Sequence, residues 1–159
     1  MKLDRDEIGR LYRQHGRGLI AYACAFVRGF EAAEDIVHQV FVRLLRGAVK
    51  IEGPPAPYLY RAVRNAALND RRNHSRDVEF DEAWLEGPPG MEGTALMIES
   101  ALRALPAEQR EVITLRIWGQ MTFEEIAVTI GVPRQTADSR YRYGLLKLRE
   151  EFRPVKKGQ

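Results

Sequence analysis

The stretch MTFEEIAVTIGVPRQTADSRYRY, at residues 121–143, decides how the C-terminal half of the chain folds. Thr122 and Glu125 fit a capping box, in which a hydroxyl and a carboxylate satisfy the free N–H groups at a helix start. Gly131 permits the positive φ that a sharp turn needs, and Pro133 suits the first turn of a second helix. The stretch therefore predicts a helix-turn-helix.

The second predicted helix, over 134–150, has an apolar face and a polar face that is rich in arginine. In a helix-turn-helix this element can enter the DNA major groove, where Arg and Gln reach base edges while Ser and further Arg bind phosphates. The candidates for DNA contact on the polar face are Arg134, Gln135, Ser139, Arg140 and Arg142. A plain pair of packed helices with a solvated face is the alternative interpretation of this segment taken alone.

Composition excludes several classes of protein. The chain has 159 residues, of which 45% are hydrophobic, enough for one ordinary core or two small ones. Its single cysteine, Cys24, cannot form an internal disulfide, and the N-terminal residues lack the apolar run of a signal peptide. No stretch approaches the roughly 20 apolar residues that span a bilayer. We therefore expect a cytoplasmic protein without membrane insertion.

Apolar residues recur at three- and four-residue steps and no β-type alternation appears, so we expect an all-α fold. Helices are predicted over 8–27, 31–47 and 58–72 in the N-terminal half, and over 94–105 and 106–119 before the helix-turn-helix. Gly16, Gly18 and Gly29 are expected to loosen or end the first helix. The second, whose apolar stripe ends with Leu45, stops at Gly47. The three prolines in IEGPPAPY, at 51–58, predict that no helix forms there.

Charge is segregated along the chain rather than in excess, since 25 Lys and Arg residues stand against 22 Asp and Glu residues. Five arginines lie between 57 and 76, whereas the stretch at 81–93 holds four acidic residues and no Lys or Arg. Because 81–93 is also rich in Gly and Pro, we interpret it as a flexible acidic linker. The predicted organisation is two small helical domains, 1–80 and 94–159, with motion about this linker.

Residues 101–152 resemble the C-terminal domain of bacterial RNA polymerase sigma factors, in which an LP-x-x-QR-x-V motif precedes a helix-turn-helix and a closing SR…LR pattern. The motif stands here as LPAEQREV at 105–112, and the closing pattern falls at 139–149. Thr136 also lies on the family's pattern. With Thr136 added, the six candidates on the second helix are the residues expected to bind the upstream promoter element.

The N-terminal half resembles the other essential domain of the same family. AEDIVHQVFVRLL at 33–45 is similar to the helix usually written AED-x-V-Q-x-V-F, and YLYRAVRNAALNDRR at 58–72 is similar to the family's WLYRIARN helix. The two motifs stand in the right order and cover nearly the whole chain. On this resemblance the chain, which is short and lacks intervening regions, is identified as a member of the extracytoplasmic-function (ECF) group.

The resemblance implies contacts with polymerase and with promoter DNA. In the family, the helix at 33–45 docks on the clamp of the polymerase's large subunit, which makes Asp35, His38 and Arg43 candidate polymerase contacts. The following loop and helix bind the downstream promoter element and trap unpaired bases, which requires cations and a stacking ring. The candidates for that site are Tyr58, Arg61, Arg64, Asn65, Arg71 and Arg72.

Two of these assignments have structural alternatives. Tyr60 is a second candidate for base stacking, and the alternative is that Tyr60 and Val63 pack inward while the arginines are solvated. Glu34 and His38 are four residues apart on a helix, as metal ligands can be. No second histidine or cysteine accompanies them, so we expect neither a metal site nor a cofactor.

Asp138 is the main departure from the family's pattern, because it stands where the family often has a lysine that could meet phosphate. Either Asp138 pairs with Arg134 or Arg142 at helical spacing, or it reads a cytosine amino group, or this domain binds DNA weakly. His38 and Tyr58 also depart from the family's usual Gln and Trp.

The resemblance implies a dissociable specificity subunit that directs promoter recognition, promoter melting and transcription initiation. Its expected partners are core RNA polymerase, promoter DNA and an anti-sigma factor. The sequence shows no glycine-rich phosphate loop, no nucleophile with a nearby base and no metal cluster, so we expect no catalytic residues and no enzyme. The alternatives are a helix-turn-helix regulator that does not engage polymerase and a sigma-like decoy that titrates an anti-sigma factor.

Overall fold

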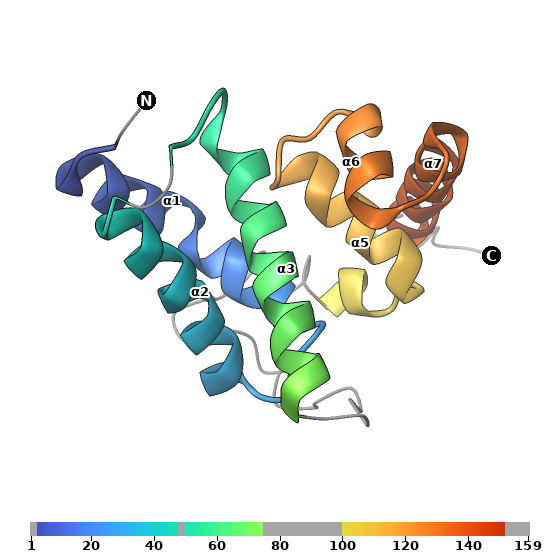
Figure 1. The fold of residues 1–159 in the computed structure, drawn as a ribbon. Coiled ribbons are helices and arrows are strands. Elements are labelled where there is room, and N and C mark those ends of the chain that lie inside the picture. The colour runs from blue at the N-terminus through green and yellow to red at the C-terminus, as the bar shows by residue number, and fades with distance from the viewer. Residues whose placement is uncertain (1–2, 48–49, 75–99, 152–159) are drawn as a thin grey trace, which may run out of the picture.

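The computed structural model describes residues 3–47, 50–74 and 100–151. These residues form the helices α1 (Arg5–Ala23), α2 (Phe30–Leu45), α3 (Pro55–His74), α5 (Ala107–Ile117), α6 (Phe123–Ile130) and α7 (Arg134–Glu151), with a further helical stretch at 100–103 (Figure 1). No strand occurs in this part of the chain, which confirms the all-α prediction. The predicted linker at 81–93 lies outside the described residues.

Helix α1 begins at a capping box formed by Asp4 and Glu7. The Glu7 backbone N–H donates to the Asp4 carboxylate at 2.8 Å, and the Asp4 N–H donates to the Glu7 carboxylate at 3.0 Å. The helix then runs through Gly16 and Gly18, so the prediction that these glycines loosen or end it is wrong. At Gly18 the reason for glycine is packing, because an added Cβ would lie 2.4 Å from the hydroxyl oxygen of Tyr60 on α3.

Helix α3 begins inside the proline-rich segment, which corrects the prediction that these prolines exclude a helix. Pro55 is the first residue of α3, and Pro57 also lies in its first turn. The first four N–H groups of an α-helix have no partner within the helix, so residues without an N–H are tolerated there. Gly53, at φ +78°, supports the turn that precedes the helix.

Helices α1, α2 and α3 pack around a common apolar core. Leu19 of α1, Ile36 of α2 and Leu59 of α3 are among its fully buried side chains. Leu45, the last residue of α2, is 49% exposed, so the apolar stripe of this helix ends before the predicted residue. Gly47 follows the helix at φ +71°, the left-handed conformation that commonly ends helices.

The helix-turn-helix forms from α6 and α7, as predicted. The Thr122 N–H donates to the Glu125 carboxylate at 3.0 Å, and the Glu125 N–H donates to the Thr122 hydroxyl at 3.1 Å, which completes the capping box. Gly131 ends α6 in the left-handed conformation, at φ +73°. Pro133 lies just before α7 rather than inside it, and its carbonyl accepts hydrogen bonds from the first turn of that helix.

Helix α7 packs closely against α5. Gly144 of α7 is buried, and an added Cβ there would lie 2.5 Å from the side chain of Ile113 on α5. Ala137 is fully buried, as expected for a residue on the inner face of the helix. Ile113 also belongs to a small buried cluster with Leu102 and Leu105. This packing leaves the opposite side of α7 available for contact with another molecule.

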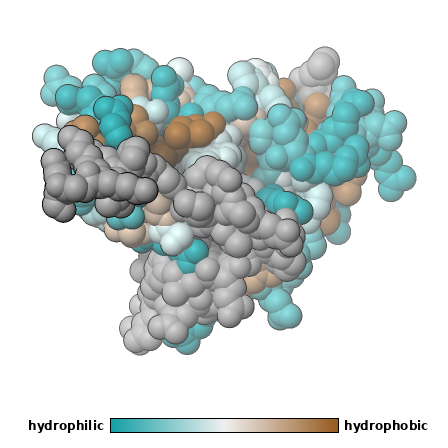
Figure 2. Space-filling view, turned by 180° about the vertical axis from the view of Figure 1, so that it is seen from behind, coloured by the Kyte–Doolittle hydropathy of each residue, from teal (hydrophilic) through white to brown (hydrophobic). Residues whose placement is uncertain are grey.

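The two halves of the chain lie side by side, with α3 next to α5 and α6 (Figure 1). One buried apolar cluster includes the N-terminal bundle together with Val112 and Leu115 of α5 and Ile126 of α6. On the opposite side of the molecule, the described residues in view are largely hydrophilic, with hydrophobic side chains in small groups (Figure 2). None of the helices in the described ranges is long and apolar enough to cross a membrane.

Candidate nucleic-acid interface

The N-terminal end of α7 presents two exposed residues of the predicted upstream interface, Arg134 and Gln135. Nε of Arg134 lies 2.6 Å from the carboxylate of Glu124 on α6. The pKa of Glu124 is lowered mainly by a hydrogen bond from the backbone N–H of Glu124 to its carboxylate, and further by the positive charge of Arg134. Both side chains are more than half exposed, so solvent screens this ion pair and a DNA phosphate can compete for Arg134.

Asp138 pairs with Arg142 and not with Arg134. Oδ1 of Asp138 lies 3.5 Å from Nε of Arg142, which follows it by four residues on α7. Arg142 also donates to the hydroxyl of Ser139 at 3.5 Å. The ion pair confirms one of the alternatives that the sequence left open. Asp138 therefore forms an ion pair with the guanidinium of Arg142, which was expected to bind DNA.

The other three candidates on α7 are only partly exposed. Thr136, Ser139 and Arg140 are half-buried. Nη2 of Arg140 lies 3.8 Å from the carboxylate of Glu108, so Arg140 contacts α5. The well-exposed candidates of the upstream interface are Arg134, Gln135 and Arg142.

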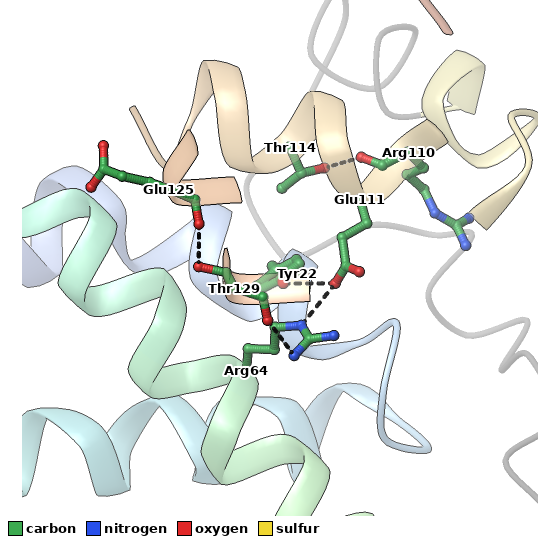
Figure 3. A network of polar contacts seen from close by, with 7 residues as sticks. All are labelled: Tyr22, Arg64, Arg110, Glu111, Thr114, Glu125 and Thr129. Atoms are coloured by element: carbon green, nitrogen blue, oxygen red, sulfur yellow. Dashed lines mark hydrogen bonds and ion pairs between the residues drawn. The ribbon is translucent and has the colours of Figure 1, made fainter. Parts of the chain in front are cut away.

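Arg64 of α3 lies between the two halves of the chain (Figure 3). Its Nε lies 3.3 Å from Oε2 of Glu111 on α5, and its Nη1 donates to the backbone carbonyl of Thr129 on α6 at 3.1 Å. Its guanidinium carbon lies 5.9 Å from the ring centre of Phe26. The Arg64 side chain is 18% exposed, so the alternative in which the arginines of this helix are simply solvated does not hold for Arg64.

Arg61, one turn earlier on α3, makes a second contact between the halves. Its Nη1 lies 3.5 Å from Oε2 of Glu125, and both side chains are about 40% exposed. Hydrogen bonds from Thr122, and less strongly the charge of Arg61, lower the pKa of Glu125. The acidic residue that caps α6 therefore also binds the predicted downstream DNA site.

The remaining downstream candidates differ in their surroundings. Tyr58 is half-buried, and burial raises the pKa of its hydroxyl while the charge of Arg43 on α2 opposes this shift. Asn65 is exposed. Tyr60 is only 1% exposed, which confirms the alternative that it packs inward and corrects its assignment as a stacking ring. The side chains of Arg71 and Arg72 lie outside the described residues.

The three candidates for polymerase contact, Asp35, His38 and Arg43, are exposed on α2. His38 is held against α1, because its Nε2 lies 2.9 Å from the hydroxyl oxygen of Tyr12. Within the described ranges, no group of three His, Cys, Asp or Glu side chains is placed to hold a metal ion. His38 is therefore oriented by a neighbouring helix, with its outer side free to meet another protein.

Two residues that sequence reasoning missed, Tyr22 and Glu111, connect the halves (Figure 3). The Tyr22 hydroxyl donates to Oε2 of Glu111 at 2.8 Å. Burial, and then the charge of Glu111, raise the pKa of Tyr22 far above its usual range. A signal for Tyr22 was present, since it lies among the apolar residues of α1 and a buried tyrosine hydroxyl needs a polar partner. Nothing in the sequence identified that partner.

Comparison with known proteins gives the family. The chain matches the family Sigma-70 region 2 over residues 11–77 and the family Sigma-70, region 4 over residues 101–150. It is 24% identical to the RNA polymerase sigma factor YlaC of Bacillus subtilis over 143 residues, which are 80% of this chain and 81% of the relative. It is 28% identical to the ECF RNA polymerase sigma factor SigL of Mycobacterium tuberculosis over 150 residues, covering 87% and 85% of the two chains.

Two solved structures share this fold. The sigma factor RpoE in complex with the anti-sigma factor NepR from Bartonella quintana superposes with a TM-score of 0.67 at 20% identity, covering 96% of this chain and all of that one. CnrH in complex with the cytosolic domain of CnrY gives a TM-score of 0.56 at 23% identity, covering 92% and 88%. The two family matches together span more than half of the sequence. The chain belongs to the sigma-70 family of RNA polymerase sigma factors, in its extracytoplasmic-function group.

Proposed function

We propose that this sigma factor is a dissociable, non-catalytic specificity subunit that acts in the cytoplasm. It binds core RNA polymerase through both halves, recognises an upstream promoter element with α7 and helps to melt a downstream element with α3. The proposed domains keep the bounds predicted from the sequence: a polymerase-binding and melting domain at 1–80, a linker at 81–93 and an upstream-element domain at 94–159.

The observation that carries the upstream role is the capped helix-turn-helix, in which α7 starts at exposed Arg134 and Gln135. The capping box and the left-handed Gly131 fix α6 relative to the turn, and close packing at Gly144 fixes α7 on α5. A rigid scaffold of this kind holds the first residues of the second helix in position for base contact. Arg134 can make a bidentate contact to guanine and Gln135 to adenine.

The downstream role is supported by the chemistry of α3. This helix carries Arg61 and Arg64 one turn apart, followed by exposed Asn65. Tyr58, at the start of the same helix, is half-buried and keeps part of its ring accessible for stacking. Guanidinium groups that follow one helix beside an aromatic ring suit an unpaired strand.

Polymerase binding is assigned to the outer side of α2. Asp35, His38 and Arg43 are exposed there, while the inner side of the same helix is buried against α1 and α3. The exposed apolar side chains Val42 and Leu45 lie on this helix as well. A mixture of charged and apolar side chains on one exposed helix is typical of a protein interface.

An anti-sigma factor is the third proposed partner. The solved relatives RpoE and CnrH were determined in complex with NepR and with the cytosolic domain of CnrY. This chain exposes large apolar side chains on both halves, with Val42 and Leu45 on α2 and Tyr143 and Leu146 on α7. Exposed apolar groups of this size are candidate contacts for the apolar face of a partner helix.

Promoter-selective transcription tests the proposed function. Purified bacterial core polymerase would transcribe fragmented genomic DNA of the source organism with and without this protein, and transcript starts would be sequenced. We expect new starts that share two spaced upstream elements. Arg134→Ala should reduce initiation at those starts about fivefold or more, because one bidentate base contact contributes roughly 1–3 kcal/mol. Arg10→Ala, at an exposed arginine of α1, is the matched control.

The alternatives give different results in the same assay. A decoy would bind core polymerase or an anti-sigma factor and produce no new starts. A regulator would bind DNA tightly by itself and never associate with polymerase. Either result would contradict the proposal.

A further inference from the structure

A polar cluster at the contact between the halves has one carboxylate at its centre. Glu111 of α5 accepts a hydrogen bond from the Tyr22 hydroxyl at 2.8 Å and lies 3.3 Å from Nε of Arg64. Arg64 completes its contacts by donating to the Thr129 carbonyl at 3.1 Å. Figure 3 shows these groups converging from helices of both halves. The cluster therefore ties α1 and α3 to α5 and α6 through charged and polar side chains.

The partners of the two carboxylates at this contact are arginines of the proposed downstream DNA site. Glu111 binds Arg64, and Glu125 lies 3.5 Å from Arg61. A carboxylate and a DNA phosphate present the same kind of charged acceptor to a guanidinium group. A guanidinium edge that is held by a carboxylate cannot bind a phosphate at the same time.

We propose that Glu111 is an intramolecular latch that closes the two halves on each other and withholds Arg64 from DNA, with Glu125 doing the same more weakly to Arg61. The inference rests on the proposed function of α3 and deepens it. In the closed form the C-terminal half presents its own carboxylates to the guanidinium groups that the downstream promoter element needs. The free protein therefore binds DNA poorly until the halves separate.

The two ion pairs contribute unequally to closure. The Arg61–Glu125 pair has side chains 41% and 39% exposed, and solvent screens such a pair to a small net effect. The Arg64–Glu111 pair is 18% and 21% exposed and shares the buried hydroxyl of Tyr22. Desolvated, hydrogen-bonded charges interact more strongly. Removing Glu111 should therefore open the molecule more than removing Glu125 does.

Opening is coupled to binding. A partner that binds the two halves only when they are apart favours the open form by the difference in its affinity for the two forms. The latch requires core polymerase to be such a partner. By linkage, closure of the latch and DNA binding oppose each other equally. Closure lowers the affinity for DNA by the same factor by which bound DNA lowers the equilibrium constant for closure. The stability of the latch therefore determines how much weaker the DNA affinity of the free protein is than that of the open form.

The test compares the full-length free protein with three variants. Glu111→Gln removes the charge but keeps the shape of the side chain, and Tyr22→Phe removes the donor but keeps the buried ring. Glu150→Gln, at an exposed residue of α7, removes one negative charge elsewhere. Small-angle X-ray scattering gives the radius of gyration of each. Fluorescence anisotropy gives the affinity for a 5′-labelled single-stranded DNA of mixed sequence, and circular dichroism checks the helical content.

We expect a radius of gyration near that of a compact chain of this length, about 15 Å, for the wild type and for Glu150→Gln. It should rise in Glu111→Gln and, less strongly, in Tyr22→Phe. DNA affinity should rise about tenfold in Glu111→Gln, the effect of losing one hydrogen-bonded charge contact. Unchanged dimensions and affinity in both latch variants would overturn the latch. An equal gain in Glu150→Gln would also overturn it, because the effect would then follow from net charge.

A larger radius of gyration without tighter DNA binding would overturn the masking of Arg64. Sigma activity is judged separately, by transcription with core polymerase and the wild-type protein. Failure of the latch and failure of the proposed function are therefore distinguishable.

Discussion

The hydroxyl of Tyr22 donates a 2.8 Å hydrogen bond to the carboxylate of Glu111, although the two residues are 89 positions apart in the sequence. Tyr22 is otherwise buried in the apolar core of the N-terminal bundle. The bond therefore brings α5 against a residue that belongs to the core of the other half. Arg64 forms an ion pair with the same carboxylate, so both halves contribute to one polar cluster.

Gly18→Ala should destabilise the fold. The added Cβ would lie 2.4 Å from the hydroxyl oxygen of Tyr60, whose side chain is almost completely buried and has little room to move. Overpacking of this kind lowers the free energy of unfolding by about 1–3 kcal/mol. Urea unfolding followed by circular dichroism measures it. Gly9→Ala is the control on the same helix, since its nearest atom is the end of the Arg13 side chain at 3.5 Å.

In Gly9→Ala we expect a gain of up to about 1 kcal/mol from better helix propensity. If the two variants had the same unfolding free energy, the close contact between α1 and α3 would be wrong.

Thr122→Ala should weaken the start of α6. The substitution removes the hydroxyl that accepts the Glu125 N–H and should lower the unfolding free energy by about 1 kcal/mol. The control is Thr114→Ala in α5, where the hydroxyl only donates to the Arg110 carbonyl of the preceding turn. Chemical denaturation of both variants provides the comparison. A loss no greater in Thr122→Ala than in Thr114→Ala would contradict the capping role.

Asp138→Asn should strengthen contact with the upstream element. The change removes the negative partner of Arg142 and leaves that guanidinium free for a phosphate. We expect holoenzyme formed with the variant to bind a promoter severalfold more tightly, with a plot of log affinity against log salt steeper by about 1. A promoter found by the transcription assay serves as the probe. If binding instead weakens at one base position only, Asp138 reads a base, as the sequence analysis allowed.

His15 should make stability depend on pH. Burial lowers the pKa of His15 below its usual 6.5, so the unfolded chain binds a proton more readily than the folded one. The unfolding free energy should therefore fall as the pH is lowered below 6.5. The lowered pKa values of Glu124 and Glu125 act in a separate window, because their contribution is lost only as pH falls below 4.5.

In His15→Gln this fall should be smaller over the range from pH 6.5 down to 4.5, below which the glutamates also contribute. Equilibrium unfolding at several pH values measures the difference. A wild-type protein whose stability is constant over this range would contradict the assignment.

Local features of the fold could be predicted from the sequence because they depend on residues close together in the chain. The capping box of Thr122 and Glu125, the left-handed Gly131 and the pairing of Asp138 with a residue four positions later are of this kind. The proline-rich start of α3 was mispredicted for a local reason too. Prolines break a helix only beyond its first turn, and the pattern did not show where that turn lies.

Contacts between the halves could not be predicted in the same way. Periodicity identifies the buried face of each helix, but it does not show which distant helix covers that face. Arg64 lies on the partly polar side of α3 and was expected to meet DNA or water, whereas the structure places it against Glu111 and Thr129. Tyr60 and Val63 are fully buried, which confirms the alternative in which both pack inward.

The most direct test of a sigma factor that is closed when free is the distance between its halves with and without core polymerase. Spin labels on Arg13→Cys of α1 and Val128→Cys of α6, both exposed positions, report this distance, and Cys24 is buried. We predict one short distance for the free protein and a clearly longer one in complexes that initiate transcription. An unchanged short distance in transcriptionally active complexes would contradict the account.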